Sequence, residues 1–221
     1  MGERIEFSRP DGSLCPGYLA QAGAGRPGVI VIQEWWGLNA QICGIADRFA
    51  EAGCNALAPD LFHGRVTQDP DEASHLMNGL DFAGATHQDI RGATDYLGKV
   101  SGKVGVMGFC MGGALTIAAA VHVPGLAAAV CFYGIPPPEF ADPASIRIPF
   151  QGHFASRDDW CTPAIVAALE AAMKGAGQTP ELYRYDAAHA FFNERRPEVY
   201  DADKAQLAWQ RTLDFLRRKL V

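Results

Sequence analysis

The chain has 221 residues, of which 48% are hydrophobic and 20% are charged, the composition of an ordinary globular protein. Its 25 acidic residues outnumber its 19 basic residues, and the net charge of −6 disfavours a nucleic-acid binder, because phosphate affinity depends on clustered Lys and Arg. No apolar run approaches the roughly 18 residues of a membrane span, and the first ten residues lack the apolar core of a signal peptide.

The first part of the chain predicts a β-hairpin followed by short buried strands. Residues 5–7 and 14–19 flank the turn Arg9-Pro10-Asp11-Gly12, which indicates an antiparallel pair. The run 28–33 is rich in Val and Ile, the pattern of a strand buried on both faces. We expect a helix at 39–52, a strand at 55–58, and then about two helical stretches, the second near 83–99.

The rest of the chain alternates regularly between strands and helices. Strands are expected at 103–109, 126–133, 148–154 and 181–185, and helices at 111–122, 163–174 and 203–219. In the last helix one apolar stripe faces the core, formed by Trp209, Leu213, Leu216 and Leu220. This order predicts an α/β fold with a mostly parallel central sheet, helices on both faces and an N-terminal antiparallel hairpin. With no repeat or linker, we expect one domain over residues 1–221.

One strand–turn–helix junction has the pattern of a nucleophile elbow. The sequence Gly108-Phe109-Cys110-Met111-Gly112-Gly113 matches G-x-nucleophile-x-G, with Cys in place of Ser. A helix N-terminus favours the thiolate form of Cys110, and the Met111 amide is free to donate to an oxyanion. The competing interpretations are a packing cysteine and the glycines of a nucleotide-binding fold; neither a GxGxxG nor a GK[ST] motif is present.

Candidate partners for Cys110 follow later strands in the expected order of nucleophile, acid and histidine. His189 follows strand 181–185 and is the candidate base. Asp158 and Asp159 follow strand 148–154 and compete for the role of orienting acid, and either could instead cap the helix that begins near Pro163.

A further acid follows the buried strand 28–33. Glu34 begins the sequence Glu34-Trp35-Trp36-Gly37-Leu38, in the loop that usually supplies a second oxyanion amide, here that of Trp35. A carboxylate at Glu34 would face the nucleophile; the alternative is a solvated loop acid.

With these residues the chain resembles the dienelactone hydrolase (carboxymethylenebutenolidase) family of α/β-hydrolases over nearly its whole length. The resemblance depends on Gln33 to Leu38, Ala58-Pro59-Asp60-Leu61-Phe62, Gly108 to Gly113, Asp159 four residues before Pro163, and His189-Ala190-Phe191. It implies a triad of Cys110, His189 and Asp159, with Asp158 as the alternative acid. It also implies that Glu34 keeps the resting thiol neutral and accepts its proton when substrate binds.

The sequence departs from this family at the substrate carboxylate. The family places an arginine four residues after the catalytic histidine, where this chain has Asn193, and no arginine lies between Val66 and Ile90. Arg65, Arg91, Arg195 or Arg196 could replace it, or could be surface charges. The resemblance therefore implies a hydrolase but leaves the dienelactone substrate open.

The sequence as a whole predicts hydrolysis of a lactone or small carboxylic ester through a thioester on Cys110. The expected pocket wall combines aromatic residues and one amide: Trp35, Trp36, Phe109, Tyr133, Trp160, Phe191, Phe192 and Asn193. Alternatives are an esterase or thioesterase of other specificity, or a catalytically silent binding protein.

No cofactor and no metal are expected, because His63, His75 and His87 are spaced by twelve residues, which matches no ligand pattern. The six scattered cysteines indicate reduced thiols and a cytoplasmic protein. We expect a small-molecule substrate, no nucleic-acid or membrane partner, and a monomer or small homo-oligomer.

Overall fold

An eight-stranded sheet forms the centre of the computed structural model, which describes residues 1–221. Its strand order is β1-β2-β4-β3-β5-β6-β7-β8. The strands are β1 (Glu3–Ser8), β2 (Leu14–Ala20), β3 (Gly28–Ile32), β4 (Asn55–Pro59), β5 (Val104–Phe109), β6 (Leu126–Phe132), β7 (Phe150–Arg157) and β8 (Glu181–Ala188). The hairpin β1–β2 pairs antiparallel with β4, and all pairs from β4 to β8 are parallel. The predicted α/β-hydrolase architecture is confirmed.

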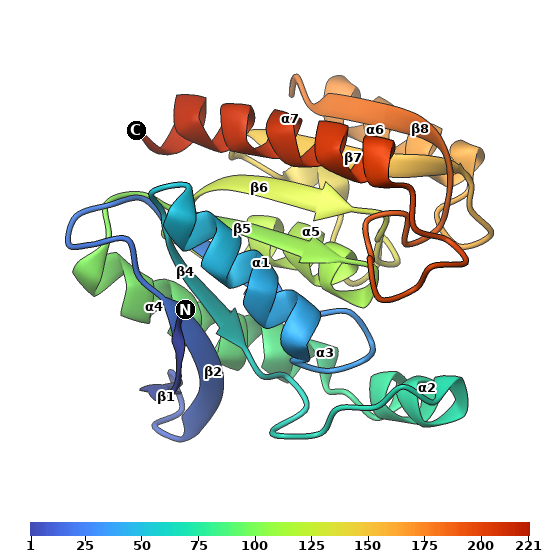
Figure 1. Cartoon of the computed structure of the whole chain (residues 1–221). Helices are drawn as coiled ribbons and strands as arrows, with labels where there is room; N and C mark the ends of the chain where they lie inside the picture. The colour runs from blue at the N-terminus through green and yellow to red at the C-terminus, as the bar shows by residue number, and fades with distance from the viewer.

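Helices cover both faces of this sheet (Figure 1). They are α1 (Ala40–Glu51), α2 (Pro70–Asn78), α3 (Phe82–Gly84), the π-helix η1 (Ala85–Ile90), α4 (Arg91–Val100), α5 (Met111–His122), the 3-10 turn η2 (Pro143–Ser145), α6 (Pro163–Gly175) and α7 (Ala202–Leu220). Several begin at a side chain that accepts from the first turn, such as Asn39 before α1 and Thr162 before α6. No helix has the length and apolar character that crossing a bilayer would require.

The sheet separates two hydrophobic cores. Ile30, Ile32 and Val106 pack on the side of α4, α5 and α6, whereas Val29, Val31 and Met107 pack on the side of α1 and α7. Alternate residues of β3 and β5 point to opposite faces, and both faces are covered, so these strands are buried at every position. The stripe predicted on the last helix lies in the second core, since Trp209, Leu213, Leu216 and Leu220 are all buried.

Two strand ends and one helical stretch differ from the sequence prediction. β7 and β8 each continue three residues beyond their predicted ends, to Arg157 and Ala188. The polar residues that follow therefore begin directly at the edge of the sheet. The helical stretch expected near 83–99 divides into α3, η1 and α4, and within it the Thr86 hydroxyl donates to the Phe82 carbonyl.

Candidate active site

Cys110 lies in a strained turn between β5 and α5. Its backbone has φ 54° and ψ −117°, in the left-handed half of φ space that non-glycine residues rarely adopt. A Cβ at Gly108 would collide with the Gly112 carbonyl, and one at Gly112 would collide with the Gln33 carbonyl. The two glycines therefore allow strand and helix to approach closely, and the turn places the sulfur at the carboxyl edge of the sheet.

Met111 and Trp35 carry the two backbone amides that we expect to form an oxyanion hole. The Met111 amide acts to lower the pKa of the Cys110 thiol, although burial and Glu34 outweigh it. The Trp35 N–H follows Glu34 in the loop after β3 and makes no hydrogen bond within the chain.

His189 is held by a carboxylate on the neighbouring strand end. Its Nδ1 donates to Asp158 Oδ2 at 2.7 Å, and Asp158 Oδ1 accepts from the Trp160 and Cys161 amides. Burial acts to raise the Asp158 pKa, but the hydrogen bond and charge of His189 and the two amides together hold that pKa below its ordinary value.

Asp158, and not the expected Asp159, is the aspartate that hydrogen-bonds to His189. Asp159 is exposed and makes no hydrogen bond with His189. A register shift between Ala155 and Arg157 interrupts the alternation of β7 just before these residues. The side that each aspartate faces therefore does not follow from counting along the predicted strand.

Glu34 is buried beneath the site, not solvated. Its carboxylate accepts from Tyr133 Oη at 3.2 Å and from Asn193 Nδ2 at 2.6 Å. Burial raises the Glu34 pKa above its usual range, while these two donors and the nearby His189 oppose that shift. Asn193, at the position of the family arginine, therefore binds a carboxylate of the protein itself.

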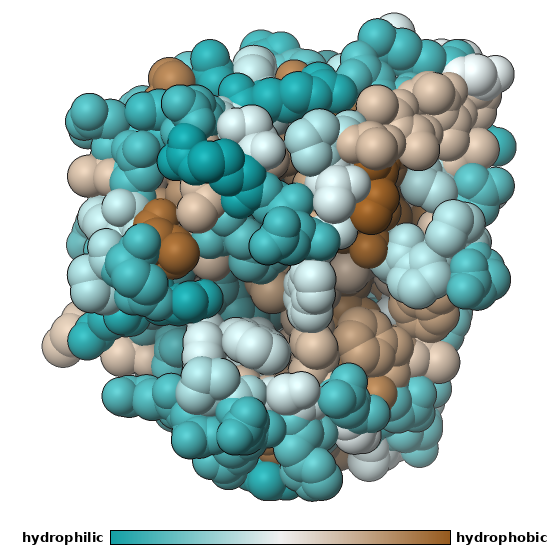
Figure 2. All heavy atoms as spheres, turned by 90° about the vertical axis from the view of Figure 1, so that its right-hand side faces the viewer, coloured by the Kyte–Doolittle hydropathy of each residue, from teal (hydrophilic) through white to brown (hydrophobic).

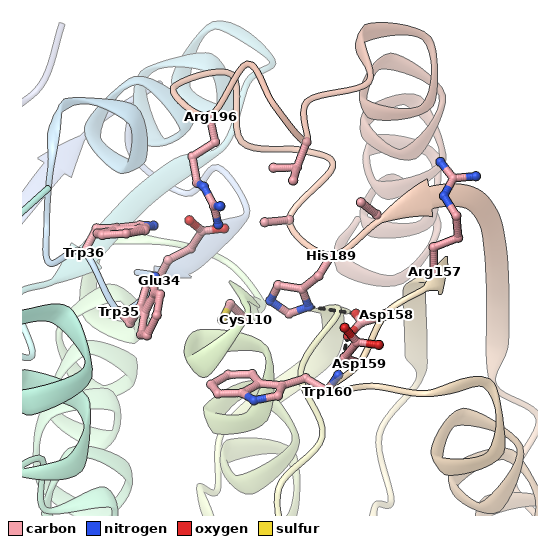
Figure 3. A pocket seen from close by; sticks show the side chains of 13 residues that line it. Glu34, Trp35, Trp36, Cys110, Arg157, Asp158, Asp159, Trp160, His189 and Arg196 are labelled. Atoms are coloured by element: carbon pink, nitrogen blue, oxygen red, sulfur yellow. Dashed lines mark hydrogen bonds and ion pairs between the residues drawn. The ribbon is translucent and has the colours of Figure 1, made fainter. Parts of the chain in front are cut away.

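Burial and the neighbouring Glu34 disfavour the thiolate form of Cys110. Burial raises its pKa well above the ordinary value, and the adjacent Glu34 charge raises it further. The amide at the start of α5 acts in the expected direction and lowers this pKa, but desolvation and the Glu34 charge outweigh it. No hydrogen bond joins Cys110 to His189, although Figure 3 shows the sulfur between Glu34 and the His189 ring.

A pocket of about 340 Å³ opens above Cys110 at the carboxyl edge of the sheet. Seen from this side, apolar residues gather in and beside a central hollow of a largely hydrophilic face (Figure 2). Sticks in Figure 3 show its lining, which is Glu34, Trp35, Trp36, Cys110, Arg157, Asp158, Asp159, Trp160, Ala188, His189, Ala190, Arg196 and Val199.

Part of the predicted pocket wall is core instead. Trp35, Trp36 and Trp160 line the pocket, but Phe109, Tyr133, Phe191, Phe192 and Asn193 are buried and do not. Phe109 stacks on Phe192, with ring centroids 5.1 Å apart, on the α7 side of the sheet. Tyr133 and Asn193 do not line the pocket, but both donate hydrogen bonds to the Glu34 carboxylate, which does.

Among the arginines considered from the sequence, only Arg196 reaches this pocket; Arg65, Arg91 and Arg195 do not. Arg196 donates to Glu198 at 2.7 Å, and its guanidinium lies 5.8 Å from the Trp36 ring centroid. Sequence reasoning missed Arg157, which lines the pocket because β7 continues to that residue, and which pairs with Asp186. No group of three or more potential metal-ligating side chains comes together.

Comparison with known proteins places the chain among hydrolases. Residues 15–220 match the model of the dienelactone hydrolase family. "Protein usf" of Aquifex pyrophilus is 36% identical over the full length of both chains. A "Putative carboxymethylenebutenolidase" of Saccharolobus solfataricus is 32% identical over 98% of both chains. The crystal structure of a "Putative Dienelactone Hydrolase" from Klebsiella pneumoniae has a TM-score of 0.86 at 26% identity, and covers 99% of both chains.

Proposed function

The chain belongs to the dienelactone hydrolase family, and on that basis we propose that it hydrolyses a lactone or small carboxylic ester through Cys110. The observation on which this depends is that Cys110, at a strained elbow, and His189, fixed by Asp158, open into one pocket. A nucleophile needs a base, and the base needs a group that orients it. We assign the orienting role to Asp158 in place of Asp159.

In the acylation step Cys110 passes its proton to Glu34 as substrate enters, and Sγ attacks the carbonyl carbon. The amides of Met111 and Trp35 donate to the oxyanion of the tetrahedral intermediate. When this intermediate collapses, the carbon–oxygen bond to the leaving group breaks, and the leaving oxygen takes the Nε2 proton of the His189 imidazolium, which keeps its Nδ1 proton on Asp158. A thioester on Cys110 remains.

Water then releases the acyl group. His189 takes a proton from water as its oxygen attacks the thioester carbon, and Asp158 keeps the imidazole oriented. The carbon–sulfur bond breaks, Glu34 returns its proton to the sulfur, and the carboxylic acid leaves. The Glu34 pKa, which burial raises, supports its role as the acceptor of this proton.

A panel of p-nitrophenyl esters, simple lactones and thioesters tests this function. We expect turnover of esters or lactones, an acyl adduct on Cys110 by intact mass, and a loss of about six orders of magnitude in kcat for Cys110→Ala, as in the subtilisin example of nucleophile removal. Cys43→Ala, a cysteine outside the pocket, is the matched control. Turnover by Cys110→Ala at the wild-type rate would refute the proposal.

The same panel separates the alternatives. Preferential turnover of thioesters would assign a thioesterase. Absence of both turnover and adduct with every compound would favour a silent binding protein on this fold.

A further inference from the structure

A second pocket meets the catalytic pocket at Cys110. It has a volume of about 450 Å³ and is bounded by the start of α5, the loop that follows β6, and residues of α2 and α3. Cys110 and Trp160 are the two residues that line both pockets. The sulfur therefore stands at the junction of two cavities, each large enough for part of a small ligand.

The two cavities differ sharply in charge. The catalytic pocket contains Arg157, Arg196 and Asp159 as well as the acids and histidine of the site. No charged side chain lines the second cavity, and its wall includes Met77, Phe82, Ile135 and Phe140. The second cavity thus suits an apolar group, whereas the catalytic pocket also offers charged partners to a polar one.

The position of His189 decides which part of a substrate enters each cavity. His189 lines only the catalytic pocket, and its proton must reach the oxygen of the leaving group. The leaving group therefore extends into the catalytic pocket. The carbonyl carbon bonds to Cys110, so the acyl chain points away from His189, past Met111 and Ala114, into the second cavity.

We propose that the second cavity is an acyl-chain site and that the preferred substrates are esters of an apolar acid of several carbons with a polar alcohol. This inference rests on the function proposed above and names its substrate class. Chain length then contributes to catalysis, since burial of each methylene stabilises the transition state by ~0.8 kcal/mol, or about fourfold in rate.

The acyl-length series of p-nitrophenyl esters from acetate to octanoate tests the site. We expect kcat/KM to rise about fourfold per methylene over the first few carbons. Ala114 is partly exposed in the first turn of α5, where Ala114→Leu fills the second cavity and keeps a good helix former. This variant should flatten the ratio of octanoate to acetate kcat/KM. Val199→Leu, which narrows the catalytic pocket, should leave that ratio as in wild type.

Three results would overturn the acyl-chain site: a flat length series in wild type, an unchanged ratio in Ala114→Leu, or equal flattening in Val199→Leu. Failure to turn over any ester would instead count against the proposed function. In that case, labelling with alkyl methanethiosulfonates tests the cavity without hydrolysis: Cys110 Sγ forms a disulfide with the alkylthio group, and methanesulfinate leaves. Hexyl should label Cys110 faster than methyl, as followed by peptide mapping, and Ala114→Leu should remove the difference; equal rates in wild type would refute the site.

Discussion

Asn193 donates from Nδ2 to Glu34 Oε2 at 2.6 Å, across 159 positions of sequence. Asn193 stands four residues after His189, where the resemblance to the family implies an arginine that binds the substrate carboxylate. It also explains how a fully buried carboxylate is accommodated beside a thiol, since a buried acid needs donors to offset its desolvation.

Asn193→Leu should destabilise the protein in a pH-dependent way. Loss of the donor leaves a buried carboxylate atom unsatisfied, which costs about 1–3 kcal/mol when Glu34 is ionised. The loss should shrink as pH falls, because protonated Glu34 has less need of a donor. Urea unfolding of both proteins at several pH values measures this, with Asn78→Leu on the exposed end of α2 as the control. A pH-independent loss would contradict this account.

Glu34→Gln should be more stable than wild type at pH 8, and the difference should diminish toward pH 5. The folded-state pKa of Glu34 is raised by burial above the ordinary 4.5. Stability from its protonated form is therefore fully present below the unfolded pKa and is lost as pH rises through the folded one. Thermal melts of both proteins across this range measure the effect. A stability difference that grows toward low pH would contradict the prediction.

The same substitution should speed alkylation of Cys110 by iodoacetamide at neutral pH in the absence of substrate. The Glu34 charge raises the pKa of the thiol, so its removal increases the thiolate fraction. Peptide mapping separates Cys110 from the half-buried Cys43, whose rate serves as an internal standard. An unchanged Cys110 rate would remove Glu34 from control of the thiol.

Asp158→Asn should lower kcat by about 10⁴-fold, the loss seen when asparagine replaces the triad aspartate of a serine protease and the histidine takes the wrong tautomer. Asp159→Asn should remain near wild type. Asn at position 158 keeps the Oδ1 that accepts the Trp160 and Cys161 amides but offers N–H to His189 Nδ1. The ester assay compares the two variants. A larger loss for Asp159→Asn would instead support the choice made from the sequence.

The sequence pattern predicts most of the site, but it does not decide between Asp158 and Asp159. The order of strands, the elbow and the post-strand position of His189 follow from hydrophobic periodicity and glycine spacing, because those signals are local. The choice between adjacent Asp158 and Asp159 depends on an irregularity late in β7. Likewise, aromatic composition cannot distinguish the core residue Phe109 from the pocket residue Trp160, because both directly border loops and only packing separates them.

The protein should lose stability as pH falls below about 6.5, because the buried His153 resists protonation in the folded state. Burial lowers its pKa to about 3, with Arg211 adding to the shift. Its stabilising contribution is therefore present above the unfolded pKa and is lost on acidification toward the folded value, with a slope of roughly 1.4 kcal/mol per pH unit. His153→Gln, which can still pair with Tyr185, should show a shallower decline between pH 7 and 4 in urea titrations. The exposed His122→Gln should follow wild type, and equal slopes for all three proteins would refute the assignment.

Two glycine substitutions should change stability in opposite directions. Gly108→Ala places a Cβ against the Gly112 carbonyl and within 2.9 Å of the Ile32 side chain, so strand and helix must separate. We expect a loss of about 1–3 kcal/mol together with reduced turnover, because the elbow moves with them. Gly44→Ala, inside α1 with no atom within 4 Å of the new Cβ, should gain about 0.5–1 kcal/mol and retain activity. Urea unfolding and ester assays of the pair separate close approach at the elbow from the general effect of replacing glycine, and a stable, fully active Gly108→Ala would show that the two elements need not touch.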